Sequence, residues 1–201
     1  MHEKKYSASA VKLSFWFAEF RKVISFLHSG KSLNDIKELA VTDNIFSAAT
    51  PMRSEQIFNT VTSRVLSLPE DYHNLFEKSN LETQKIIALI AVMETDALFY
   101  DFMNDVYREK LITGNTILTD ADIRIFFTDK QRESEKVSGW TDATLDRLKR
   151  CYKTYLSEAG LLLERGKGDR KIIKPLIDNR LSALLAETNK NQIVSILLGT
   201  R

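Results

Sequence analysis

The sequence predicts a mainly α-helical protein made of two small helical domains. Only seven of its 201 residues are glycine and three are proline, so few positions interrupt regular structure. Between these interruptions the apolar residues recur every three to four positions, which is the period of an amphipathic helix. With 43% hydrophobic and 28% charged residues, the chain can bury a core. The least arbitrary boundary lies near Gly114, which predicts one domain over residues 1–114 and another over residues 115–201.

The first two helices are predicted from an apolar stripe and a capping motif. The stripe over residues 13–27 predicts a helix that ends near Gly30, where a left-handed C-cap is expected. Ser32 and Asp35 then have the spacing of a capping box, which predicts the start of a second, shorter helix. This first half of the chain is therefore expected to be a helical bundle.

Further helices are predicted after Pro51, which breaks the chain. Ser54 is expected to cap the next helix, and Asn80 is expected to cap a long helical run that is interrupted near residues 94–96. This run contains "IIALIAVM" at residues 86–93, which is far shorter than the roughly 20 residues that span a bilayer and so predicts a buried core helix. A single cysteine permits no internal disulfide, which is typical of a reducing compartment. We therefore expect a cytoplasmic protein without a membrane segment.

The last part of the chain is predicted to be winged-helix-like. Thr119 and Asp122 form a second capping box ahead of one helix, and Thr141 is a natural N-cap for the next helix, which is expected to end at Gly160. Two short apolar runs, "LLLE" and "KIIKPL", then flank the turn-forming "RGKGDR" of residues 165–170, which predicts a short β-hairpin. Helix, helix and basic hairpin follow one another in the order of a winged helix-turn-helix.

Positive charge is concentrated in this last part. The whole chain has a net charge of +2, but residues 147–180 contain ten basic and four acidic residues, a net of +6. On a helical wheel Arg150 lies almost opposite the apolar stripe of its helix. Such a one-sided cluster in a near-neutral protein is typical of a polyanion-binding surface. The candidate DNA-binding residues are Arg147, Lys149, Arg150 and Lys153 on the helix and Arg165, Lys167, Arg170 and Lys171 in the hairpin.

Other kinds of chemistry have weaker support. Asp101 and Asp105 lie one helical turn apart and could bind a hard cation, although such carboxylates normally form a solvated or paired face. The three histidines are scattered without Cys or Glu at ligand spacing, so no zinc motif is predicted. The sequence contains no phosphate-binding glycine loop, no nucleophile elbow and no H-E-x-x-H motif. We therefore expect no enzyme activity, no metal, no cofactor and no small-molecule substrate.

Aromatic residues suggest an alternative function. Phe15 and Phe26 fall on the side of the first predicted helix that lies opposite its main stripe. A helix that is apolar on two faces is either central in its bundle or covered by a partner. With the aromatic "ALFYDF" of residues 97–102, these positions make a protein–protein scaffold the second candidate function.

Five stretches, which follow in order over nearly the whole chain, carry a resemblance to a known family. They are "KYSAS" (residues 5–9), "GKSLNDIKELAVTDNIF" (30–46), "ETDALFYDFMNDVYREKL" (94–111), "LTDADIRIFF" (118–127) and "SGWTDATLDRLKRCYKTYLSEAGLL" (138–162). Together they resemble the BrxA family of the BREX (bacteriophage exclusion) phage defence systems.

This resemblance implies a mostly helical fold with two small globular parts, similar to the antitermination factor NusB, that binds double-stranded DNA. It implies a non-enzymatic accessory protein that acts with the BREX methyltransferase, ATPase and phosphatase-like components. It supplies no catalytic residues, and the family's basic surface is placed on Arg147, Lys149, Arg150 and Lys153. RNA binding is a further alternative, which rests only on the NusB analogy.

Overall fold

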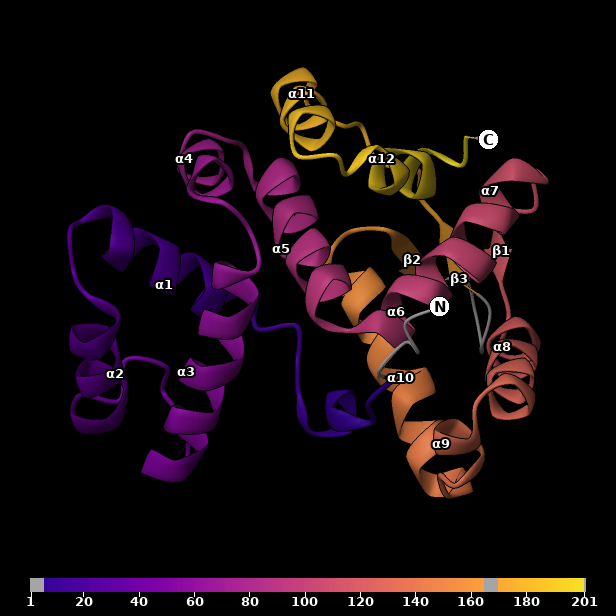
Figure 1. Cartoon of the computed structure of the whole chain (residues 1–201), viewed down its shortest axis with the longest axis horizontal. Helices are drawn as coiled ribbons and strands as arrows, with labels where there is room; N and C mark the ends of the chain where they lie inside the picture. Colours follow the sequence, from indigo (N-terminus) through magenta and orange to yellow (C-terminus); the bar gives the residue numbers. More distant parts are fainter. Residues whose placement is uncertain (1–5, 165–169, 201) are drawn as a thin grey trace. The chain divides into compact units, whose positions relative to one another are not determined.

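The computed structural model describes residues 6–164 and 170–200 and is mainly helical, as the sequence predicts (Figure 1). The chain divides into two compact units. We call Phe15–Thr95 the inserted unit, because the chain leaves the other unit after Ser14 and returns to it at Asp96. The other, the main unit, contains the described residues up to Ser14 and from Asp96 onward. The boundary expected near Gly114 lies inside this main unit.

Five helices make up the inserted unit. They are α1 (Phe17–His28), α2 (Leu33–Thr42), α3 (Pro51–Leu66), α4 (Glu70–Glu77) and α5 (Leu81–Thr95). Helix α3 packs against α1, α2 and α5, and α4 packs against α1 and α5. Residues 86–93 of α5 are all buried, which confirms the apolar run as a core helix. Within the described part of the chain, no helix combines the length and apolarity that crossing a bilayer requires.

The helix starts in this unit are only partly as predicted. Ser32 and Asp35 form the predicted capping box, and the Asn80 side chain accepts a hydrogen bond from a backbone N–H in the first turn of α5. The prediction that α1 contains the whole apolar stripe is wrong, because the helix begins only at Phe17. Trp16 has a left-handed backbone (φ 52°), which a right-handed helix cannot include.

The prediction that Ser54 caps the third helix is also wrong. Thr50 is the N-cap, since its side chain accepts a hydrogen bond from the Arg53 N–H, and Pro51 occupies the first helical position. Proline is well suited to this position because the N–H that it lacks would have no partner inside the helix. Ser54 lies one turn further on, where its buried hydroxyl donates a hydrogen bond to the Ala40 carbonyl of α2.

The main unit combines helices with a three-stranded antiparallel sheet of strand order β1-β3-β2. The chain passes through η1 (Ser9–Lys12), then α6 (Ala97–Phe102), the π-helix η2 (Met103–Arg108), α7 (Glu109–Ile112) and β1 (Ile117–Leu118). It continues through α8 (Asp120–Glu133), α9 (Glu135–Ser138), α10 (Asp142–Glu158), β2 (Leu162–Glu164), β3 (Arg170–Ile172), α11 (Asn179–Glu187) and α12 (Asn191–Leu198).

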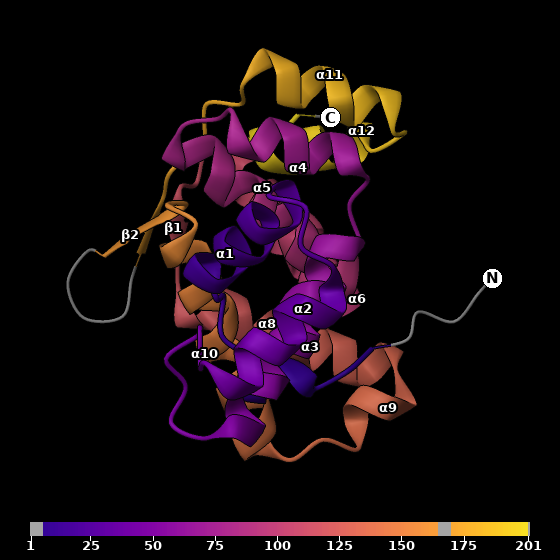
Figure 2. The same ribbon diagram turned by 90° about the vertical axis from the view of Figure 1, so that its left-hand side faces the viewer.

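These elements follow one another in the order of a winged helix. The predicted hairpin is confirmed, since β2 and β3 pair antiparallel, and β1 pairs with the other edge of β3. Helices α8 and α10 lie between β1 and this hairpin along the chain, and the sheet lies beside α10 (Figure 2). The short α9 makes the connection between α8 and α10 longer than the roughly three- to four-residue turn of a simple helix-turn-helix.

An aromatic core holds α8 and α10 in place. The Tyr152 ring of α10 lies 5.0 Å from the Phe99 ring and 5.8 Å from the Phe127 ring, measured between centroids. The Phe102 ring lies 5.4 Å from both Tyr152 and Phe126. Aromatic pairs at such separations stabilise a core beyond the area that they bury. The inner faces of α8 and α10 are therefore fixed, which also fixes the outer faces.

Candidate nucleic-acid interface

Helix α10 carries four of the eight predicted DNA-binding residues. As predicted, the Thr141 side chain caps its N-terminus by accepting a hydrogen bond from the Thr144 N–H, and Gly160 follows its end with a left-handed backbone (φ 81°). The buried face of the helix is formed by Leu145, Leu148, Tyr152, Tyr155 and Leu156. Because this face belongs to the core, the opposite face is exposed to solvent. Arg147 and Arg150 lie on that exposed face.

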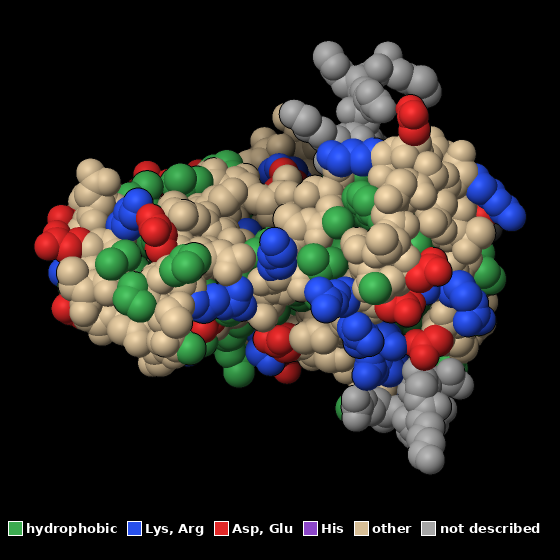
Figure 3. Space-filling view, turned by 90° about the horizontal axis from the view of Figure 1, so that it is seen from below, with side chains coloured by type: hydrophobic (Ala, Val, Ile, Leu, Met, Phe, Trp, Pro, Cys, Tyr) green, Lys and Arg blue, Asp and Glu red, His purple; other side chains and the backbone are tan. Residues whose placement is uncertain are grey.

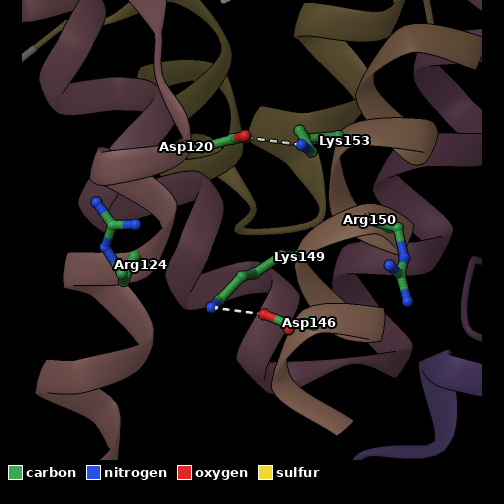
Figure 4. A pocket seen from close by; sticks show the side chains of 6 residues that line it. All are labelled: Asp120, Arg124, Asp146, Lys149, Arg150 and Lys153. Atoms are coloured by element: carbon green, nitrogen blue, oxygen red, sulfur yellow. Dashed lines mark hydrogen bonds and ion pairs between the residues drawn. The ribbon is translucent and has the colours of Figure 1, made fainter. Parts of the chain in front are cut away.

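A groove between α8 and α10 brings three of the predicted residues together. It has a volume of about 330 Å³ and is lined by six charged side chains (Figure 4). Those predicted from the sequence are Lys149, Arg150 and Lys153, and the others are Asp120, Arg124 and Asp146. Four positive and two negative charges give the lining a net charge of +2. Figure 3 shows Lys and Arg side chains interleaved with Asp and Glu on one face of the molecule.

Both lysines of the groove are bound by carboxylates. The Lys153 Nζ donates a hydrogen bond of 2.7 Å to Asp120 of α8, and the Lys149 Nζ donates one of 3.0 Å to Asp146. The hydrogen bond from Lys149 and its positive charge lower the pKa of Asp146, so that carboxylate is ionised at neutral pH. The two lysine charges are therefore compensated inside the groove.

The arginines near the groove form fewer ion pairs and hydrogen bonds than its lysines. Arg124, Arg147 and Arg150 are exposed, and none of their guanidinium groups forms an ion pair or hydrogen bond with another residue in the described ranges. Arg124 was not predicted, because it lies outside the basic segment of residues 147–180. A helical wheel places Arg124 outside the buried face of α8, although it follows the buried Ile123 in the sequence. Its position in the groove depends on the packing of α8 beside α10, which the wheel does not predict.

The hairpin residues are divided between the two faces of the sheet. Lys171 is exposed and lies opposite Leu163, which is also exposed. Arg170 shares the other face with the buried Ile172, because side chains alternate along a strand. Of the two hairpin candidates that the structure describes, Lys171 is exposed and Arg170 is half-buried. Arg165 and Lys167 lie outside the described residues.

The carboxylates considered as cation ligands are paired with a lysine. The Nζ of Lys130 lies 3.5 Å from Asp101 and 3.2 Å from Asp105, and Asp101 also accepts a hydrogen bond of 2.6 Å from the Tyr6 hydroxyl. Across residues 6–164 and 170–200, no cluster of three or more His, Cys, Asp or Glu side chains could hold a metal ion. These carboxylates therefore form a structural ionic cluster.

The aromatic residues that suggested a partner surface are mostly core residues. Phe15 is 1% exposed, and Phe99 and Phe102 are fully buried. Phe26 is partly exposed and lies beneath the Lys31 ammonium group, which is 5.9 Å from the ring centroid. Phe26 and Tyr100 are the half-buried exceptions among these aromatic side chains.

The chain matches a known family over most of its length. The sequence profile of the BrxA family matches residues 4–189. A relative from Bacillus cereus (strain H3081.97), described as BREX protein BrxA, is 39% identical over 197 residues, which are 98% of this chain and 98% of the relative. The structure is also similar to the crystal structure of an uncharacterized protein from Magnetospirillum magneticum, with a TM-score of 0.79 over 97% of this chain and 99% of that chain. At 16% identity, that similarity concerns the fold alone.

Proposed function

The chain belongs to the BrxA family and is a component of a BREX phage defence system, and from this premise we propose that it is an accessory protein that binds double-stranded DNA. One observation carries the proposal. In a winged-helix order of elements, the face of α10 opposite the core presents Arg147 and Arg150 to solvent. The second helix of a helix-turn-helix is the one that docks on DNA.

The chemistry of this face favours contacts with phosphates over contacts with bases. Arg and Lys side chains bind phosphate oxygens, whereas Asn and Gln are the usual readers of adenine. Helix α10 contains no Asn and no Gln. Duplexes of different sequence should therefore bind with similar affinity.

Fluorescence anisotropy of a labelled random duplex between about 50 and 200 mM salt tests the proposal, because phosphate-led binding weakens steeply over this range. We expect a slope of log affinity against log salt of about −3 to −5, which corresponds to four or five neutralised phosphates. The double substitution Arg147→Ala/Arg150→Ala should reduce the magnitude of this slope by about 2 and weaken binding.

The matched control is Arg21→Ala/Lys78→Ala. It removes the same charge from two exposed residues of the inserted unit and should leave affinity almost unchanged. Equal losses in both double variants would contradict the role of α10. If wild-type protein fails to bind at the lowest salt, duplex DNA is not the ligand. Competition with RNA of equal length and co-purification of the other BREX proteins would then test the two alternatives.

A further inference from the structure

The groove between α8 and α10 is lined by two carboxylates, those of Asp120 and Asp146. We infer that Asp120 and Asp146 compete with DNA phosphates for Lys153 and Lys149, so that binding exchanges two internal carboxylates for phosphates. This inference rests on the proposed function and concerns what sets the affinity of the same site. Asp120 and Asp146 would limit how tightly the protein holds DNA and would make the complex easier to release.

The exposure of the paired groups supports this competition. The side chains of Lys149 and Lys153 are 23% and 17% exposed, whereas those of Asp146 and Asp120 are 58% and 62% exposed. The carboxylates are therefore the more accessible members of both pairs. A phosphate that approaches from solvent meets negative charge beside each lysine, and it gains the lysine only by displacing the carboxylate.

The unpaired guanidinium groups explain how DNA can still bind. Arg124 on α8 and Arg150 on α10 lie on either side of the two ion pairs (Figure 4). Because the lysine and aspartate charges cancel, the net charge of +2 equals the charge of these two arginines. We expect Arg124 and Arg150 to make the first phosphate contacts, which adds Arg124 to the DNA-binding residues. Replacing both aspartates by asparagine would double the net charge of the lining.

The salt dependence of binding distinguishes a paired lysine from a free one. A free lysine that contacts a phosphate releases one counterion from the DNA, which contributes about 0.9 to the slope of log affinity against log salt. A lysine that first leaves a carboxylate also exposes that carboxylate, which takes up a cation. The two effects oppose each other, so a paired lysine contributes little to the slope.

The test compares Asp120→Asn and Asp146→Asn with wild-type protein in the anisotropy titration. At about 0.1 M salt each substitution should tighten duplex binding about two- to fivefold, the factor that corresponds to losing one exposed ion pair. Each should also steepen the salt slope by about 0.9. The control is Glu187→Gln on α11, which removes the same charge from an exposed residue of the same unit outside the groove and should change neither quantity.

A second pair of variants tests the mechanism directly. If Asp120 acts through Lys153, then Asp120→Asn should not steepen the salt slope in a Lys153→Ala background, because no lysine is then freed to contact a phosphate. Asp120 also lies in the first turn of α8, so circular dichroism should confirm that its variant is folded, and Asp146→Asn provides an independent site. Wild-type binding that neither aspartate variant strengthens would overturn this inference alone. Absence of binding by wild type and by both variants would overturn the proposed function.

Discussion

At the scale of single residues, Tyr6 and Asp101 show how a buried polar group is held in the main unit. Asp101 is 4% exposed, and its negative charge is compensated by Lys130 and by the hydrogen bond from the Tyr6 hydroxyl. Burial, the hydrogen bond to Asp101 and the charge of that carboxylate raise the pKa of Tyr6 to about 12. The hydroxyl must keep its proton in order to donate, so this contact depends on pH.

Tyr6→Phe should therefore destabilise the protein in a pH-dependent way. A tyrosine whose pKa is raised by folding contributes stability that is fully present below its unfolded value of 10.0 and is lost as pH rises through about 12. The free energy of unfolding of wild type should exceed that of Tyr6→Phe by about 1 to 2 kcal/mol up to pH 10. This difference should then shrink with rising pH, as urea denaturation between about pH 8 and 11.5 would measure.

Tyr107 and Tyr152 are the control within the same comparison. Burial raises the pKa of both, so they also weaken the fold at high pH. Because they are present in both proteins, their effect cancels in the difference. A difference that stays constant from pH 8 to 11.5 would show that the Tyr6 hydroxyl does not hold Asp101.

At the scale of secondary-structure elements, some helix ends can be predicted from the sequence and others cannot. Both capping boxes, the one at Ser32 and the one at Thr119, were predictable because their hydrogen bonds join residues three positions apart. The late start of α1 was not predictable, because Trp16 has a left-handed backbone and its ring contacts residues of α3 that lie far away in the sequence. The guanidinium groups of Arg53 and Arg64 lie 5.0 and 6.0 Å from its ring centroid.

The candidate site shows the same limit. The basic face of α10 was predictable, because the residues of one helical face lie close together in sequence. The pairing of Lys153 with Asp120 was not, since it joins residues 33 positions apart and exists only when α8 lies beside α10. Arg124 was missed for the same reason. Periodicity identifies a helical face, but it does not identify the neighbouring helix.

Helix α12 ends at a glycine that packs closely against α7. Gly199 has a left-handed backbone (φ 62°), and a Cβ there would overlap the Leu111 side chain and lie 3.2 Å from the Leu111 carbonyl carbon. Gly199→Ala should therefore cost backbone strain of about 1 to 2 kcal/mol plus the displacement of Leu111. We expect a lower midpoint of urea denaturation.

The control is Gly114→Ala. Gly114 also has a left-handed backbone (φ 71°), but apart from Gly114 itself and its two chain neighbours, no atom of the described residues lies within 4 Å of the position that its Cβ would take. That substitution should cost only the backbone strain, about 1 to 2 kcal/mol. Equal destabilisation in the two variants would contradict the close contact between Gly199 and α7.

At the scale of the whole molecule, the chain is a main unit with a second helical unit inserted into it. Helices α1–α5 pack on one another and share buried residues such as Val23, Ile24 and Val61. A unit with its own core is expected to fold alone. The isolated residues 15–95 should therefore be helical by circular dichroism and should unfold in one cooperative transition with urea.

Val61→Asp tests whether that transition reports the core. Val61 is fully buried in α3, and an unpaired carboxylate there should abolish cooperative unfolding of the isolated unit. A gradual, non-cooperative loss of helicity in the unsubstituted fragment would show that the inserted unit depends on the rest of the chain for its fold.

The insertion determines the order in which the protein can be completed on the ribosome, where the chain emerges N-terminus first. Tyr6 emerges before the inserted unit, but its hydrogen-bond acceptor lies 95 residues later in the chain and follows that unit. Helix α12 packs against η2, so the main unit lacks this packing partner until residues 191–198 have been made. All five helices of the inserted unit have been made well before that point. Residues 6–14 are therefore synthesised before the rest of the main unit, and the whole inserted unit is made between these two parts.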